Sequence, residues 1–116
     1  MNNETITQLI NQAAASGKLD LCEQQLTMLP PTVVELTNLE ELYLDSNQLT
    51  ELPAEIAQLI NLRVLSLTDN RLSALPSSVT ELKNLEWLYL ANNQFTSVPS
   101  EITQLHNLKV ISLDNN

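Results

Sequence analysis

A strict period of 23 residues runs through most of this chain and constrains its fold more than any other feature. A proline preceded by leucine or valine recurs at this spacing as Leu29-Pro30, Leu52-Pro53, Leu75-Pro76 and Val98-Pro99. Two asparagine columns keep the same period, at Asn47, Asn70, Asn93 and Asn116 and at Asn38, Asn61, Asn84 and Asn107. Two apolar columns do so as well, at Leu19, Leu42, Leu65, Leu88 and Ile111 and at Leu21, Leu44, Leu67, Leu90 and Leu113. Because no insertion breaks the register, the sequence predicts a stack of similar units.

Each unit contains the signals for a strand, a turn and a short helical segment. Alternation at Leu42 and Leu44 predicts a short strand with both leucines facing inward. The amide of Asn47 can satisfy backbone groups left open where the chain then bends, and the proline after the next leucine ends any strand. Residues 54–62 favour one or two helical turns on the outer side. Since each unit leaves leucines uncovered on both faces, only stacking can bury them.

The pattern L-x-x-L-x-L-x-x-N-x-L-x-x-L-P-x-x-I/V-x-x-L-x-N resembles the 23-residue class of leucine-rich repeats. The Leu-Pro-x-x-Ile/Val variant is similar to intracellular repeats of Ras-group-related, bacterial and Roco-type proteins. The resemblance implies an α/β fold, a right-handed leucine-rich repeat solenoid with short parallel strands on its concave face and helical turns on its convex side. It also implies that the chain recognises another protein.

The two ends of the chain differ from the repeats between them. Residues 1–18 are predicted to form a capping helix, and residues 19–116 hold about four full repeats and the start of a fifth. One helical stripe contains the apolar residues Ile6, Leu9, Ile10, Ala13 and Ala14. Three residues are candidates for the N-cap, namely Asn2, Asn3 and Thr5. Gly17 occupies the position of a C′ glycine, so the helix most simply covers the first repeat, with partner binding as the alternative.

The fifth repeat has no polar capping unit after its strand, which would leave Leu108, Ile111, Leu113 and a strand edge open. Three explanations stay open at this point. The sequence is the front part of a longer protein, the end pairs with another copy to give a homodimer, or a short natural product tolerates the exposed edge.

Charge and composition exclude several classes of partner. The net charge is −9, and the five cationic residues are dispersed rather than clustered, which argues against nucleic acid and against an anionic membrane surface. No run of 18 apolar residues could span a bilayer, and the first residues lack the pattern of a signal peptide. The single cysteine, Cys22, cannot form an internal disulfide. Together these features favour the cytoplasm.

Residues that could support catalysis or bind a metal or cofactor are isolated. His106 has no credible nucleophile to pair with, and Cys22 is expected to be a plain thiol because only Lys18 nearby could lower its pKa. The segment from Asp45 to Ile56 lacks the glycine and the glutamate of a calcium loop. We therefore expect no enzyme, no metal and no cofactor. The alternatives are the recognition part of a larger enzyme, such as a Roco-type GTPase or a ubiquitin ligase, and a self-assembling solenoid.

Aromatic residues on the predicted concave face indicate where a protein partner could bind. Phe95 takes a core leucine position, whereas Tyr43, Trp87 and Tyr89 fall on strand positions that the core does not require. With Val64 between them, they predict an apolar patch. Its predicted rim consists of Glu41, Asp45, Asp69, Arg71 and Glu86. The acidic rim suggests a partner with basic character, and the alternative is that the aromatics only brace neighbouring strand side chains.

Overall fold

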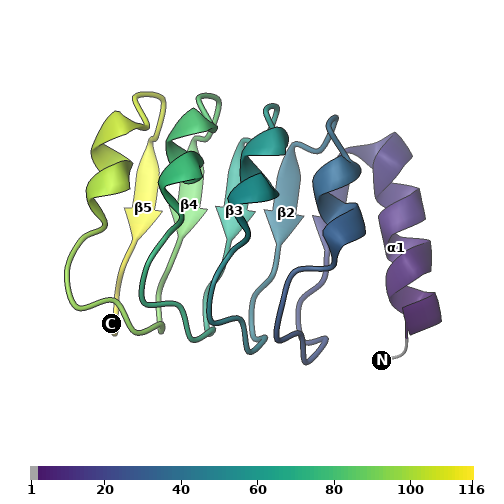
Figure 1. Cartoon of the computed structure of the whole chain (residues 1–116), viewed down its shortest axis with the longest axis horizontal. Helices are drawn as coiled ribbons and strands as arrows, with labels where there is room; N and C mark the ends of the chain where they lie inside the picture. Colours follow the sequence, from purple (N-terminus) through teal and green to yellow (C-terminus); the bar gives the residue numbers. More distant parts are fainter. Residues whose placement is uncertain (1–2) are drawn as a thin grey trace.

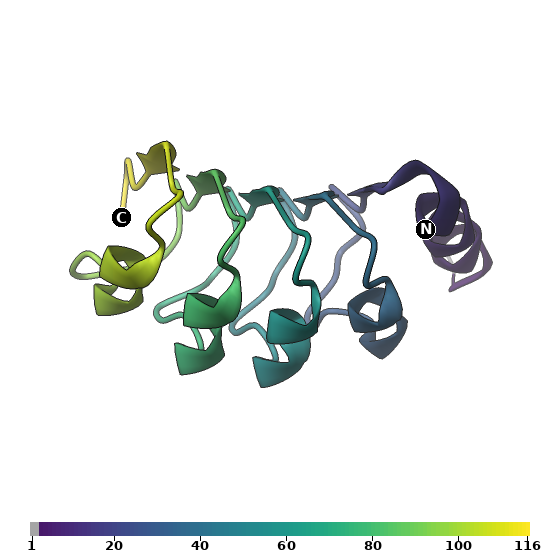
Figure 2. The same ribbon diagram turned by 90° about the horizontal axis from the view of Figure 1, so that it is seen from above.

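The computed structural model describes the backbone of residues 3–116 and the side chains of residues 5–116. Five three-residue strands form one parallel sheet in chain order (Figure 1), and they are β1 Lys18–Asp20, β2 Glu41–Tyr43, β3 Val64–Ser66, β4 Trp87–Tyr89 and β5 Val110–Ser112. Four 3₁₀ helices alternate with them, namely η1 Pro31–Glu35, η2 Ala54–Gln58, η3 Ser77–Glu81 and η4 Ser100–Gln104. The sheet lies on the concave side of the arc and the 3₁₀ helices lie on the convex side (Figure 2). The predicted solenoid is confirmed.

The sequence period is also the register of the sheet. Lys18 pairs with Glu41, Glu41 with Val64, Val64 with Trp87, and Trp87 with Val110, each partner 23 residues further along the chain. An offset of one residue would turn every leucine from the core to solvent, so the leucine columns fix this register.

Stacked leucines make up the core. The central residue of each of the first four strands is fully or almost fully buried, as shown by Leu19, Leu42, Leu65 and Leu88. In the second repeat, Ile56, Leu59 and Leu62 are also completely buried, so the short helical segment that was predicted outside the sheet closes the core from the convex side. Pro53 precedes this 3₁₀ helix, where its fixed φ suits a helix start.

An asparagine ladder links consecutive repeats through hydrogen bonds to the backbone. The Asn47 amide oxygen accepts from the N–H groups of Gln24 and Leu26, both at 3.0 Å. Its amide nitrogen donates to the carbonyl oxygens of Leu21 at 3.0 Å and Leu44 at 2.9 Å. One side chain therefore satisfies backbone groups of two repeats in the bend after each strand, as the sequence predicted for this position.

The asparagines of the second column make a weaker connection. Asn61 donates to the carbonyl oxygen of Thr37 at 2.9 Å, and Asn84 donates to that of Ile60 at 3.0 Å. These side chains are exposed, so water can replace the hydrogen bonds that they form.

Helix α1, Asn3–Ser16, packs against β1 at one end of the stack (Figure 1). Ile10 and Ala13 are buried against the core, but Ala14, which the helical pattern places in the apolar stripe, is exposed. The first repeat covers only a narrow stripe, so the flank of the helix remains in solvent. Among the N-cap candidates, Asn2 lies outside the described residues and Asn3 is already helical.

Gly17 ends α1 and connects it to the sheet. Its φ of +75° is the left-handed conformation that glycine adopts without a steric penalty. The Gly17 N–H donates to the carbonyl oxygen of Ala13, and its own carbonyl oxygen accepts from the N–H groups of Glu40 and Glu41.

The opposite end of the stack is less well buried. Leu108, Ile111 and Leu113 are only partly buried, whereas the corresponding Leu85, Leu88 and Leu90 of the preceding repeat are completely buried. On its outer edge β5 has no strand neighbour within residues 3–116. The leucines of the fifth repeat therefore keep contact with solvent.

The asparagine ladder leads to a prediction about stability. In Asn70→Ala, the buried N–H of Leu49 loses the amide oxygen that it donates to, and the carbonyl oxygens of Leu44 and Leu67 each lose one hydrogen bond and keep those from Asn47 and Asn93. We expect the free energy of unfolding, measured by urea titration, to fall by about 3 kcal/mol, because a buried N–H without a partner is costly and two further buried hydrogen bonds are lost. Asn61→Ala is the matched control, with an expected loss below about 1 kcal/mol. Equal losses in the two variants would contradict this role for the ladder.

Candidate functional site

The stacked strands bring one set of predicted site residues together on the concave face. Successive side chains of a strand alternate between core and surface, so the first and third residues of each strand face outward. A shallow hollow of about 400 Å³ is lined by six residues, namely Glu41, Tyr43, Arg63, Val64, Trp87 and Tyr89. All except Arg63 were singled out from the sequence. This hollow is called the concave aromatic patch below.

The aromatic side chains of the patch are half-buried, with part of each ring in contact with solvent. This is true of Tyr43, Trp87 and Tyr89, whereas Phe95 is buried in the core as predicted. In the sheet register, Ser66 lies directly between Tyr43 on one neighbouring strand and Tyr89 on the other. Neighbouring strands lie about 4.8 Å apart, so the two tyrosines stand roughly 10 Å apart across a small residue.

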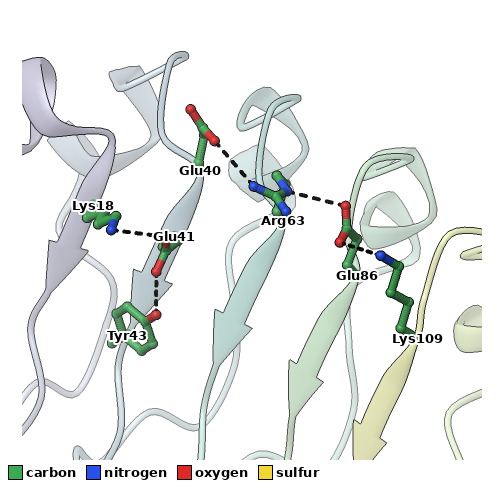
Figure 3. A network of polar contacts seen from close by, with 7 residues as sticks. All are labelled: Lys18, Glu40, Glu41, Tyr43, Arg63, Glu86 and Lys109. Carbon is green, nitrogen blue, oxygen red and sulfur yellow. Dashed lines mark hydrogen bonds and ion pairs between the residues drawn. The ribbon is translucent and has the colours of Figure 1, made fainter.

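Tyr43 is oriented by Glu41, since its hydroxyl donates a hydrogen bond to the Glu41 carboxylate (Figure 3). This hydrogen bond, together with burial and the negative charge of Glu41, raises the pKa of Tyr43 from 10.0 to about 12. The phenol is therefore held in one direction and stays protonated at physiological pH.

Two cations at the edge of the patch, Arg63 and Lys109, were not predicted from the sequence. The guanidinium carbon of Arg63 lies 5.7 Å from the centroid of the Trp87 ring, and the ammonium nitrogen of Lys109 lies 5.5 Å from it. Both distances are within the range of a cation–π interaction. These residues come directly before β3 and β5, and their 23-residue column, Glu40, Arg63, Glu86 and Lys109, alternates in charge. This alternation of charge is the feature of the sequence that could have predicted the two cations.

Glu86 connects Arg63 and Lys109 (Figure 3), which are the two cations on either side of Trp87. Its carboxylate lies 3.2 Å from Arg63 Nε and 3.2 Å from Lys109 Nζ. Hydrogen bonds from Arg63 and then from Lys109 lower the pKa of Glu86, and the hydrogen bond that Arg63 donates to Glu86, followed by the charge of Glu86, raises the pKa of Arg63. Trp87 is thus held between two cations that share one carboxylate.

Ion pairs change the predicted character of the rim. Glu41 pairs with Lys18 at 3.6 Å, and Glu40 pairs with Arg63 at 3.7 Å, in addition to the two ion pairs of Glu86. Glu41 and Glu86 were expected to be part of an acidic rim, but cations within the chain compensate their charges. The sequence did not predict these ion pairs because the partners are neighbours only across the stack.

The other three rim residues lie outside the hollow. Asp45 is half-buried and accepts hydrogen bonds from Ser66 Oγ at 2.6 Å and from the Thr68 N–H at 2.9 Å. Asp69 adopts a positive φ of 60° where the chain bends after β3, and Arg71 follows the bend. Both are exposed, and neither lines the concave aromatic patch.

The structure also shows the surroundings of the two reactive residues that the sequence singled out, Cys22 and His106. Burial, followed by a hydrogen bond with Asp20, raises the pKa of the Cys22 thiol from 9.0 to about 12, so the nucleophilic thiolate is disfavoured. His106 is exposed in the turn that follows η4. Within the described residues, no group of three or more His, Cys, Asp or Glu residues is arranged to hold a metal ion.

The Glu41–Tyr43 hydrogen bond predicts a specific dependence on pH. Because the pKa of Tyr43 is raised in the folded protein, the stability contributed by the Glu41–Tyr43 hydrogen bond is fully present below the ordinary pKa of 10.0. This contribution is lost as the pH rises to about 12. In a near-ultraviolet titration of tyrosinate absorbance, Tyr43→Phe should remove the transition near pH 12. Glu41→Gln should move that transition towards 10.0, and Tyr89→Phe is the control that should retain it. An unchanged midpoint in Glu41→Gln would contradict the assignment.

Several solved structures resemble this chain. A leucine-rich repeat protein of Leptospira interrogans is 25% identical over 94% of the chain, with a TM-score of 0.65. The leucine-rich repeat domain of the type III effector XopL is 26% identical over 96% of the chain, with a TM-score of 0.79. An internalin from Listeria monocytogenes is 24% identical over 96% of the chain, and its TM-score of 0.80 shows likeness of fold. The chain spans 45%, 41% and 35% of the three proteins, respectively.

No curated protein matches the sequence. Among the described residues, no helix has the length and apolar character needed to cross a membrane. The family of leucine-rich repeat regions matches residues 42–116, which is more than half of the chain. The protein therefore belongs to the leucine-rich repeat family.

Proposed function

We propose that this chain is a protein-interaction module that binds a protein partner on its concave aromatic patch. The observation that carries the proposal is the position of Tyr43, Trp87 and Tyr89, which share one open hollow although the core needs none of them. Tyrosine and tryptophan are favoured anchors of protein interfaces because they are large and rigid and have a polar group. The parallel strands display these anchors on a firm support.

The contacts around the aromatics favour binding over simple bracing of the sheet. Trp87 is held by Arg63 and Lys109, and Tyr43 is held by Glu41, so these rings are oriented before a partner arrives. An interface formed by fixed side chains loses less conformational entropy on binding. Leucines, with a few other apolar side chains such as Ile56 and Phe95, fill the core, so the rings of Tyr43, Trp87 and Tyr89 are not needed for burial.

The repeat pattern and one of the similar structures support a proposal for the biological setting. We assign the chain to the intracellular 23-residue class with Leu-Pro-x-x-Ile/Val repeats, acting in the cytoplasm without cofactor or catalysis of its own. One similar structure is the leucine-rich repeat domain of a type III effector, which supports a role in signalling or as an effector. In the alternative, the chain is the recognition part of a larger enzyme, such as a Roco-type GTPase or a ubiquitin ligase, and would use the same patch.

Truncating the aromatic anchors tests the proposal. Proteins that the wild-type chain retains from a cell extract should be lost when Trp87→Ala or Tyr89→Ala is immobilised instead. For an identified partner, calorimetry should show a loss of affinity of about thirtyfold for each variant, which is typical of an interface hot spot. Ile60→Ala is the control, since this 58% exposed side chain lies outside the strands. If both aromatic variants bind as tightly as the wild type while remaining folded, the patch is not the binding site.

The open edge of β5 supports self-association as a second candidate function. Leu108, Ile111 and Leu113 stay partly exposed at this end, whereas α1 covers the other end of the stack. Two copies that meet through their β5 edges would bury these side chains. Because each copy then offers only one open end, the product is a closed dimer and not a filament.

Sedimentation velocity over a range of concentrations tests this candidate. The wild-type chain, of 13.0 kDa, should reach twice this mass as the concentration rises. Ile111→Glu should remain monomeric because it places a charge at the contact, and Ile60→Glu is the control that should still dimerise. A wild-type chain that stays monomeric throughout would exclude self-association.

A further inference from the structure

Charge is unevenly distributed along the strand direction of the concave face. At the edge where the strands begin, three cations and three carboxylates alternate and compensate one another, namely Lys18, Glu40, Glu41, Arg63, Glu86 and Lys109. At the edge where the strands end, five carboxylates stand against the single cation Arg71, and they are Asp20, Glu23, Asp45, Asp69 and Asp114. The concave aromatic patch lies between a neutral edge and an acidic edge.

The carboxylates of the acidic edge are available to a partner. Asp20, Glu23, Asp69 and Asp114 are exposed, and no ion pair within the described residues engages them. Asp20 also lies directly beside Tyr43 in the sheet register, so the acidic edge and the aromatic patch are continuous. A ligand that contacts the rings therefore also meets a negative potential on one side only.

We infer that the partner presents an apolar or aromatic anchor to the concave aromatic patch and lysine or arginine side chains to the acidic edge. This inference rests on the proposed function and adds the chemistry of the partner. A basic group over the acidic edge finds uncompensated carboxylates, whereas an acidic group there meets only repulsion. At the opposite edge every charge already has a partner, so that edge gives little preference between basic and acidic groups.

The dimensions of the sheet set the length of the contact. Five strands at about 4.8 Å spacing extend over roughly 19 Å, which an extended segment crosses in about six residues. Such a segment runs across the strands, from Asp20 at the end of β1 to Asp114 after β5. Its side chains on one flank then lie over the acidic edge.

A displayed library of random peptides tests the inference, with peptides of about twelve residues, twice the length that crosses the sheet. We expect peptides selected on the wild-type chain to combine an aromatic or leucine anchor with lysine or arginine. The double variant Asp69→Asn with Asp114→Asn should weaken a selected peptide about fivefold at low salt, since each exposed ion pair contributes modestly. The effect should shrink as salt is added.

A second double variant is the matched control. Glu55→Gln with Glu81→Gln removes the same two charges from exposed positions in η2 and η3, on the convex side, and should leave the affinity unchanged. Trp87→Ala separates the two levels of the proposal. The basic partner would be overturned if the selected peptides are acidic or neutral, or if both double variants change the affinity equally. In that case, a loss of peptide affinity in Trp87→Ala would still support the proposed function. If no peptide is enriched, the inference is also overturned, and if Trp87→Ala binds normally, both proposals fail.

Discussion

The asparagine amide in the bend after each strand is the interaction on which the rest of the structure depends. Asn47 bonds to backbone groups of the repeat before it and to those of its own repeat, and Asn70 does the same one repeat later. Bends that lack regular backbone pairing therefore keep their hydrogen bonds inside a dry core. This requirement fixes the distance and the register between neighbours, so every residue meets its counterpart 23 positions away.

The concave aromatic patch is a consequence of that register. Tyr43 and Trp87 are separated by 44 positions along the chain but come from strands with only β3 between them, so they line one hollow. The same stacking places Glu86 between Arg63 and Lys109, which turns three separate charges into a support for the Trp87 ring. A surface built in this way is rigid because its side chains are held by neighbours in the next repeats.

Much of this arrangement could be predicted from the sequence, because in a solenoid the contacts follow the period. The leucine columns predicted the core, Asn47 predicted the bend, and Gly17 predicted the end of the capping helix, which its φ of +75° bears out. The alternation of side chains along a strand separated Phe95, in the core, from the aromatics on the surface.

The remaining features depend on distances between side chains, which a repeat pattern does not contain. Ala14 keeps to the helical stripe but is exposed, since the first repeat covers only part of α1. Asp69 and Arg71 leave the patch because the positive φ at Asp69 turns the chain after β3. The sequence by itself determined the solenoid, its register and the concave position of Tyr43, Trp87 and Tyr89, because these follow from periodicity and burial. Only the tertiary structure decided which carboxylates are compensated by cations and that Arg63 completes the patch, because long charged side chains form ion pairs with residues of neighbouring repeats.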